Sequence, residues 1–476
     1  MSPGSQGGPL AKRGALLALL VSAVALLAFA DRDLSPPHRA SFGEPAVQPM
    51  PRVDADDVLA STWYCAAGTA TAGGNANLTV VVANAGTEKV DGTVTWYPAN
   101  AKPVSTPIDV PASGSLSVAA TDSIDAPVAS AVVDVRGGGI AVEHVVSGER
   151  GASVAPCASD ASPTWYFANG TTERDAVEVL ALFNPFPDDA IVDITFATDE
   201  GRDEPAALSG LPVPAGTTTL VNLQDHVRRR AVTATSVVAR SGRLVADRVQ
   251  SFDGSAGRRG VSLALGAPGL ARAWTFPDGL VDNGLAEQWH VYNPGTQEAE
   301  VELQIVPAKG ASIEPIDLTV PAHSQIVVDG PTNEGVPKGV AHSSTVSSLG
   351  DVPVVVERSL DARPPSSRRG WTSTFGSPLA RSTWLLPFGA ATGATDEWVV
   401  VHNPSPAKVT VSITALAGGQ ELAVEGLQDL PISPGGRIAV RVGEHIERSP
   451  LPLIVSATGG EIVVERDIYR VGASGL

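Results

Sequence analysis

The chain has 476 residues, of which 43% are hydrophobic, and it contains 48 glycines and 38 prolines. This length exceeds what one hydrophobic core usually serves, so we expect three or four domains, and the many turn residues favour β-sheets with short strands. The formal net charge of -18 excludes nucleic acid as an expected partner, because a nucleic-acid-binding protein needs a basic face to displace counterions.

Residues 1–30 are predicted to be an export segment. Two basic residues, Lys12 and Arg13, precede an uninterrupted apolar or small run over 14–30. The small-x-small triplet that ends at Ala30 resembles a cleavage site, whereas the length of the run is near the lower limit for spanning a bilayer. The sequence leaves open a cleaved signal peptide and a retained signal anchor, and it predicts membrane contact through this segment only.

Residues 31–60 combine frequent proline with charged and small residues. Low hydrophobicity and repeated proline are typical of an extended linker without a fold of its own. We therefore expect a spacer between the export segment and the rest of the chain.

The remaining chain is an internal repeat. A Trp is followed by Gly five residues later, by Glu thirteen later and by Asn-Pro nineteen later, and these landmarks recur at unchanged offsets. The three full sets are Trp165, Gly170, Glu178 and Asn184; Trp274, Gly279, Glu287 and Asn293; and Trp384, Gly389, Glu397 and Asn403. A fainter set contains Trp63, Gly68 and Asn84. The predicted copies are copy 1 (61–160), copy 2 (161–270), copy 3 (271–380) and copy 4 (381–476).

Within a copy the apolar residues alternate with a period of two, which predicts β-strands. In copy 4 the segments 398–402, 408–416, 437–442, 453–458 and 462–466 are rich in β-branched residues and bounded by turn residues. With an opening strand at Trp384 and a weaker segment near 427–432, the count is about seven, as in an immunoglobulin-like sandwich. The predicted fold is all-β, with tandem immunoglobulin-like β-sandwich repeats after an N-terminal export or anchor helix.

The last predicted strand of each copy carries an acid followed by a base: Glu143-His144, Asp247-Arg248, Glu357-Arg358 and Glu465-Arg466. We expect each Arg to pair with the landmark Glu of its own copy, because an Arg fork on a carboxylate would join two strands. The expected pairs are Glu178 with Arg248, Glu287 with Arg358, and Glu397 with Arg466. A structural role is favoured over catalysis, since a catalytic pair would not be repeated in three successive domains.

The other landmarks suit structural roles. A large aromatic ring with one N–H group suits a domain end or a junction between copies, so each landmark Trp is expected to pack there, with a sugar-stacking platform as the alternative. Asn-Pro after a strand predicts a turn, because Asn bonds nearby backbone and Pro ends the ladder.

Two features distinguish individual copies. Cys65 and Cys157 lie after the export segment and bracket copy 1, so a disulfide is expected, with two free thiols as the alternative. Trp96, Trp289 and Trp398 are additional aromatics in predicted strands. They would form a glycan- or protein-binding platform if exposed, and part of the core if buried.

No motif predicts catalytic residues, a metal site or a cofactor: the nucleophile elbow, the zinc-protease motif, the phosphate loop and the dinucleotide fingerprint are all missing from the sequence. The pattern W-x-[FL]-x-x-G, followed by E-x-x-x-x-x-N-P and a closing E-R, resembles the repeat of an uncharacterised family of exported actinobacterial proteins. This resemblance implies an exported, envelope-associated, non-enzymatic protein, and it implies no ligand.

The sequence therefore predicts an extracytoplasmic binding or scaffold protein of the cell envelope, either anchored to the membrane or secreted. Its expected partner is an envelope glycan or another envelope protein. Two alternatives remain: an accessory factor in cell-wall glycan or glycoconjugate assembly, and an envelope glycan hydrolase with an active site made across domains.

Overall fold

The computed structural model describes residues 50–54, 58–310 and 313–471, all of which belong to the unit Val47–Leu476. The predicted export segment 1–30 and most of the predicted linker lie outside these residues. In the described ranges the regular structure consists of β-strands and four short 3-10 helices: η1 (Ala120–Asp122), η2 (Ala206–Leu208), η3 (Leu223–Asp225) and η4 (Val442–Glu444). None of the helices in these ranges has the length and hydropathy to cross a membrane.

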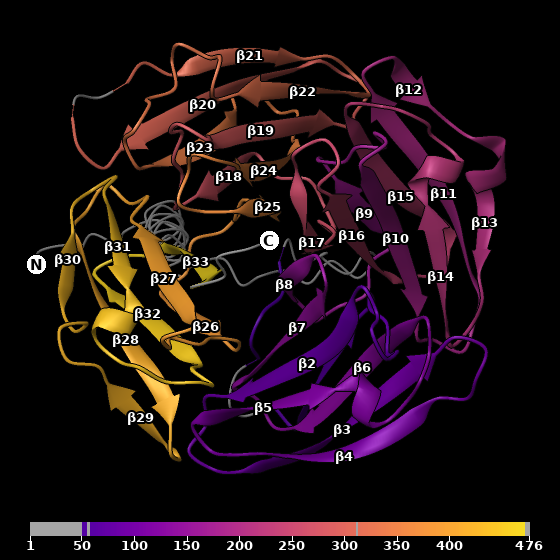
Figure 1. Cartoon of the computed structure of the whole chain (residues 1–476), viewed down its shortest axis with the longest axis horizontal. Coiled ribbons are helices and arrows are strands. Elements are labelled where there is room, and N and C mark those ends of the chain that lie inside the picture. Colours follow the sequence, from indigo (N-terminus) through magenta and orange to yellow (C-terminus); the bar gives the residue numbers. More distant parts are fainter. Residues whose placement is uncertain (1–49, 55–57, 311–312, 472–476) are drawn as a thin grey trace, which may run out of the picture. The chain divides into compact units, whose positions relative to one another are not determined.

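The strands form four pairs of antiparallel sheets, one pair for each predicted copy. Figure 1 labels most of the strands and colours them by their position in the sequence. Sandwich 1 has one sheet in the order β1 (Ala60–Cys65), β6 (Ala129–Arg136), β3 (Val90–Pro98) and β4 (Val104–Val110). Its other sheet has the order β5 (Gly114–Ala119), β2 (Asn77–Asn84), β7 (Ile140–Gly148) and β8 (Gly151–Pro156).

Sandwich 2 repeats this plan with one small addition. Its first sheet has the order β12 (Gly201–Asp203), β11 (Ala190–Thr198), β15 (Thr233–Ser241) and β9 (Thr164–Phe167), with β13 (Ser209–Val213) also paired to β11. Its second sheet has the order β14 (Thr217–Asn222), β10 (Ala176–Asn184), β16 (Val245–Asp253) and β17 (Arg259–Leu265).

Sandwich 3 has the same two sheets. The first has the order β18 (Ala273–Phe276), β23 (His342–Ser348), β20 (Ala299–Pro307) and β21 (Ile316–Val320). The second has the order β22 (Ser324–Asp329), β19 (Leu285–Asn293), β24 (Val355–Ala362) and β25 (Gly370–Phe375).

Sandwich 4 has a three-stranded second sheet within the described residues. Its first sheet has the order β26 (Thr383–Leu386), β32 (Leu453–Thr458), β28 (Val409–Ala417) and β29 (Gln420–Ala423), and β30 (Leu430–Ile432) also pairs with β28. The order of its second sheet is β31 (Arg437–Arg441), β27 (Thr395–His402) and β33 (Val463–Arg470).

The core of each sandwich lies between its two sheets, as the alternating sequence predicts. On β11, Val192, Ile194 and Phe196 are buried, while the exposed Ile191 and half-buried Asp193 point the other way. The central strand β2 differs, because Val80 to Ala83 are all buried. A run that is buried on both faces indicates that one face of the sheet covers the core of its own sandwich and that the other face packs against another part of the chain.

The seven predicted strands of copy 4 correspond to β26, β27, β28, β30, β31, β32 and β33, and the short edge strand β29 was not predicted. Sandwich 1 has eight strands, one more than expected. In an immunoglobulin constant domain the first strand pairs with the second, whereas β1 pairs with β6. The likeness to that fold is therefore one of sandwich architecture and does not extend to strand order.

Successive sandwiches are packed directly against one another. The last strands of sandwiches 1 to 3 are neighbours, since β17 contacts both β8 and β25. Aromatic contacts join sandwiches 1 and 2, where the Tyr97 and Phe183 rings lie 5.0 Å apart. The Tyr292 hydroxyl of sandwich 3 lies 2.7 Å from the Ser236 hydroxyl of sandwich 2.

Candidate functional site: the polar junctions between sandwiches

The closing acid and base of each sandwich enter two different junctions. Adjacent residues of a strand point to opposite faces of its sheet, so an acid and the base that follows it cannot face the same neighbour. The base of each sandwich contacts the acid of the next one, and the base of sandwich 4 contacts the acid of sandwich 1. The four contacts are His144 with Asp247, Arg248 with Glu357, Arg358 with Glu465, and Arg466 with Glu143. They form a closed cycle.

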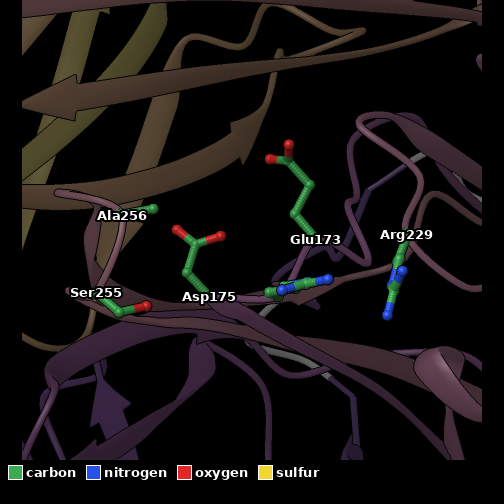
Figure 2. Close-up of a pocket in the computed structure, with 6 residues that line it drawn as sticks. Glu173, Asp175, Arg229, Ser255 and Ala256 are labelled. Carbon is green, nitrogen blue, oxygen red and sulfur yellow. The ribbon is translucent and has the colours of Figure 1, made fainter.

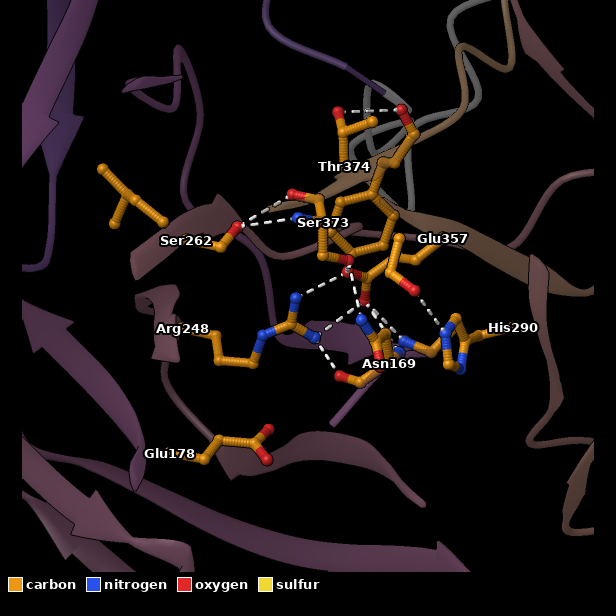
Figure 3. A network of polar contacts seen from close by, with 12 residues as sticks. Asn169, Glu178, Arg248, Ser262, His290, Glu357, Ser373 and Thr374 are labelled. Carbon is orange, nitrogen blue, oxygen red and sulfur yellow. Dashed lines mark hydrogen bonds and ion pairs between the residues drawn. The ribbon is translucent and has the colours of Figure 1, made fainter. Parts of the chain in front are cut away.

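The junction of sandwiches 2 and 3 shows the arrangement most fully (Figure 3). Arg248 and Glu357 are both completely buried and form a two-pronged pair, with Nη1–Oε1 at 2.9 Å and Nη2–Oε2 at 2.6 Å. The Glu357 carboxylate also accepts hydrogen bonds from the Ala168 N–H, the Asn169 N–H and the Ser373 hydroxyl. These extra donors are what a carboxylate needs when it is removed from water.

The segment directly after each landmark Trp supplies part of every junction. Ala168 and Asn169 follow Trp165, and their counterparts in sandwiches 3 and 4 are Asp278 and Phe388. The Asp278 N–H donates to Glu465 at 3.1 Å, and the Phe388 N–H donates to Glu143 at 2.8 Å. The repeated motif therefore builds one type of junction, in which a base and backbone N–H groups hold the acid of the neighbour.

The junction of sandwiches 1 and 2 uses histidine in place of arginine. His144 Nε2 lies 2.9 Å from Asp247 Oδ2, which also accepts hydrogen bonds of 2.9 Å from the Ala66 and Ala67 N–H groups. His144 Nδ1 lies 3.3 Å from the Cys157 sulfur. Within the described residues, Cys65, His144 and Cys157 are the one group with metal-ligand spacing, but both sulfurs are placed in a disulfide.

We expect the Cys65–Cys157 disulfide to be present in the protein purified without a reductant. Proteolysis without reduction should release the two cysteine peptides as one crosslinked species, and reduction should separate them, which mass spectrometry can detect. Alkylation of both thiols in the absence of a reductant would contradict this expectation.

The predicted pairing of Glu and Arg within each copy holds only as a long contact between Glu287 and Arg358, and it is wrong for Glu178 with Arg248 and for Glu397 with Arg466. Each Arg directs its guanidinium to the acid of the neighbouring sandwich, and the landmark Glu of the same sandwich lies beside it without a short contact. The nearest approach is that of Arg358 Nη1 to Glu287 Oε1, at 3.7 Å. The charges still interact, because Arg248 and Arg466 lower the pKa values of Glu178 and Glu397, although burial raises them more.

The landmark glutamates are buried carboxyl groups. Glu178, Glu287 and Glu397 are each 0% exposed. Burial raises the pKa of Glu178 to about 8 and that of Glu397 to about 7. Glu178 accepts a hydrogen bond from the Thr171 N–H at 2.9 Å, whereas Glu287 lies 3.0 Å from His342 Nε2. In sandwich 1 the corresponding position is Leu78, so that junction has no such carboxyl.

The landmark Gly makes room for the landmark Glu. A Cβ atom at Gly170 would lie 2.5 Å from Glu178 Oε1 and 2.5 Å from the Thr233 carbonyl oxygen. The same conflict would arise at Gly279 with Glu287 and at Gly389 with Glu397. The constant spacing of Gly and Glu thus has a steric cause.

We expect Gly170→Ala to lower the free energy of unfolding by about 1 to 3 kcal/mol, because the new methyl group would push against backbone and a buried carboxyl. Urea unfolding followed by circular dichroism would measure the change. Gly269→Ala is the matched control, since its Cβ would meet no atom within 4 Å and no loss is expected there. Equal stability of the two variants would contradict the steric explanation.

The remaining landmarks are placed as structural elements. Trp165, Trp274 and Trp384 each donate their indole N–H to a backbone carbonyl at 2.9 Å. The side-chain amide of each landmark Asn donates to nearby carbonyls, and its oxygen accepts the N–H two residues later, in the form of a turn. These residues are Asn84, Asn184, Asn293 and Asn403.

The prediction that Trp96 and Trp289 face a ligand is wrong, because both side chains are buried. Trp96 and Trp289 are each 0% exposed, and their indole N–H groups bond to Thr106 and Ser344 within their own sandwiches. Both are core residues, because their strands direct them between the two sheets. Trp398 is half-buried and donates to Asp396 at 3.1 Å, so its ligand-facing role stays a prediction.

Two cavities lie near the junction of sandwiches 2 and 3. One, of about 470 Å³, is lined by charged and small residues, and Figure 2 shows Glu173, Asp175 and Arg229 around it. The other, of about 380 Å³, has residues of both sandwiches in its wall, among them Gln250 and His290. Glu173 lines both cavities.

Gln250 and His290 were not predicted as site residues, although the repeat contains a signal for them. Gln250 lies two residues after the closing base, where the other copies have Val146, Leu360 and Ile468. His290 lies three residues after the landmark Glu, at a position occupied by Ala181 and Val400 in copies 2 and 4. These two positions are polar where the sister copies are apolar, which distinguishes copies 2 and 3 at this junction.

Comparison with known proteins gives a family without an assigned activity. A search of the curated proteins gives no match. Among solved structures, the chain is similar to one described as "Crystal Structure of Thermotoga maritima 1070", with 22% identity over 22% of this chain and 93% of the other, at a TM-score of 0.21. It is also similar to the Anabaena sensory rhodopsin transducer, with 27% identity over 18% of this chain and 91% of that one, at a TM-score of 0.16. TM-scores this low support no statement about fold or function.

The family model described as "Family of unknown function (DUF5719)" matches residues 120–361, which is just over half of the chain. The matched range runs from η1 in sandwich 1 to β24 in sandwich 3. It includes Arg248 and Glu357 of the junction between sandwiches 2 and 3, whereas Ser373 and Trp371 on β25 lie beyond it. The chain belongs to the DUF5719 family, a family of unknown function.

Proposed function

We propose that this protein is a rigid, non-enzymatic binding scaffold of the cell envelope that acts outside the cytoplasm. The observation that carries the proposal is the closed cycle of acid–base contacts between its four sandwiches, in which each side chain is at most 14% exposed. Breaking a contact leaves its remaining partner without a counterpart in a buried or half-buried position, so relative motion of the sandwiches is opposed. A body of this kind suits the presentation of fixed surfaces to a partner.

The structural contacts of the carboxyl groups support a binding function over a catalytic one. The closing acids and the landmark glutamates are both repeated from sandwich to sandwich, and the closing acids are occupied by junction contacts. Glu357, for example, accepts hydrogen bonds from Arg248, Ala168, Asn169 and Ser373. A carboxylate held by so many donors has few lone pairs left to contact a substrate.

Support for an extracytoplasmic location comes from two sequence features. The apolar segment 14–30 after two basic residues predicts export, and the disulfide between Cys65 and Cys157 suits an oxidising compartment. An actinobacterial envelope is the setting implied by the repeat motif. An envelope glycan or another envelope protein is the proposed partner.

A binding screen tests this proposal. The full chain, purified in mild detergent, would be incubated with isolated envelope polysaccharides and whole cell-wall fractions, with release of reducing ends measured in parallel. Saturable binding without cleavage is expected. Cleavage of a polysaccharide would overturn the non-enzymatic assignment in favour of a glycan hydrolase, and failure to bind any fraction would overturn the envelope-binding assignment.

A further inference from the structure

The cavity of about 380 Å³ at the junction of sandwiches 2 and 3 contains buried hydrogen-bonding groups without protein partners. Gln250 is 0% exposed, and neither its amide oxygen nor its amide nitrogen has a hydrogen-bond partner among the described residues. His290 is 4% exposed, and its Nδ1 atom has no partner there either. An unpaired buried polar group is unfavourable, so such groups in a cavity wall indicate a ligand that satisfies them.

The groups in the wall are uncharged and offer both donors and acceptors. The Gln250 amide has one acceptor and two donors, while His290 stays neutral because burial lowers its pKa to about 3. His290 Nε2 is 3.1 Å from the Ser359 hydroxyl, which orients the ring. A hydroxyl group both donates and accepts, so it matches this set better than a carboxylate, which only accepts, or an ammonium group, which only donates.

The charged residues of the wall already have protein partners. Arg258 interacts with Glu173 and with Asp175, the latter at 3.2 Å from its Nη2 atom. Asp329 accepts hydrogen bonds from Gln288 at 2.9 Å and from Thr332 at 2.6 Å. Asp329 has no ion-pair partner among the described residues, so the wall disfavours an anionic ligand, and two hydrogen bonds from neutral groups already hold its carboxylate.

An aromatic pair supplies an apolar part of the wall. The rings of Phe252 and Trp371 meet edge to face with centroids 4.7 Å apart, and both residues line the cavity. Small-molecule sites commonly combine such an apolar surface with a few converging polar groups, in volumes of about 300 to 1,000 Å³. A sugar ring presents this combination, because it carries hydroxyl groups at its rim and C–H groups on its faces.

We propose that this cavity binds a neutral saccharide unit, with Gln250 and His290 bonding its hydroxyl groups and Trp371, which Phe252 supports from behind, contacting its ring. The assignment rests on the proposed function, since it names the chemical class of the envelope ligand and places it at one junction. It also accounts for the polar residues at two positions where sister copies are apolar. At the other three junctions, the positions equivalent to Gln250 and His290 are occupied by apolar residues.

Binding of defined sugars tests the proposal. The full chain in mild detergent would be titrated with neutral hexoses, pentoses, N-acetylhexosamines and their disaccharides, and with N-acetylglycinamide as an amide probe, using saturation-transfer NMR. We expect saturable binding of at least one saccharide and a loss of affinity of about ten-fold in Gln250→Leu and in His290→Val. Both substitutions introduce residue types that occupy the equivalent positions in other copies, so the fold should be retained.

Gln428→Leu in sandwich 4 is the matched control, because it makes the same chemical change outside this cavity, and its sugar affinity should equal that of the parent chain. Failure of every saccharide to bind would overturn the proposal, as would equal affinity of Gln250→Leu and the parent. The saccharide assignment would also be overturned if the amide probe bound where the sugars did not, and if Gln250→Leu lost affinity for that probe. If Gln250→Leu bound the envelope polymer as well as the parent chain does, the polymer would bind elsewhere on the protein. The cavity proposal would then be overturned, and the scaffold proposal would stand.

Discussion

Arg248→Met is expected to lower the free energy of unfolding by about 3 to 5 kcal/mol, because it removes one partner of a buried ion pair. Arg248 and Glu357 are both 0% exposed, and the remaining Glu357 carboxylate would lie in the junction of sandwiches 2 and 3 without a counter-charge. Glu178 would also lose the nearby positive charge that lowers its pKa. Urea unfolding, followed by tryptophan fluorescence and circular dichroism, would measure the loss.

Two controls distinguish the effect of the unpaired buried charge on stability from the effect of replacing an arginine by methionine. In Arg248→Met/Glu357→Gln both charges are removed, while the new amide oxygen can still accept from the Ala168 and Asn169 N–H groups, so most of the stability should return. Arg136→Met breaks an exposed pair with Asp91 and should change the free energy of unfolding by less than about 1 kcal/mol. If Arg248→Met were no more harmful than Arg136→Met, the junction contacts would not hold the sandwiches together.

Glu178→Gln is expected to remove a pH dependence from the stability of the protein. Burial raises the pKa of Glu178 from 4.5 to about 8 in the folded chain, so the folded state keeps a proton that the unfolded state releases. The stabilising effect of this proton is complete below pH 4.5 and is lost as the pH rises toward about 8. In the middle of this interval the change approaches about 1.4 kcal/mol for each pH unit.

The measurement is the difference in unfolding free energy between Glu178→Gln and the parent chain, taken at several pH values. The variant cannot ionise at this position, so its stability relative to the parent should rise between pH 4.5 and about 8 and stay constant outside that interval. Comparison with the parent cancels the contributions of other titrating groups, such as His290 and His402. A constant difference across the interval would show that Glu178 is ionised in the folded protein.

The local features of this protein could be predicted because they depend on residues near one another in the chain. The period of two indicated the strands β27, β28, β31, β32 and β33, since alternate side chains of a strand face the same side. The Asn-Pro landmarks indicated turns, because the Asn side chain bonds to backbone only a few residues away. The repeat itself was visible because its landmarks have constant spacing.

The partner of each closing base could not be predicted in the same way. A strand pattern shows that Asp247 and Arg248 face opposite sides, but it contains no information about which sandwich lies on each side. The tertiary structure decided that Arg248 binds Glu357, which is 109 residues away, and not Glu178 of its own sandwich. Burial of Trp96 and Trp289 was decided similarly, because only the packing of two sheets determines which face of a strand is covered.

The sequence by itself determined the strands, the turns, the fourfold repeat and the acid–base dipeptide at the end of each copy, because each depends on short-range geometry. Only the tertiary structure decided which charges meet and where a cavity remains, because those outcomes depend on contacts between residues far apart in the chain. Gln250 and His290 illustrate the difference. Each is an isolated polar residue in a strand, and they line one cavity only because sandwiches 2 and 3 are packed together.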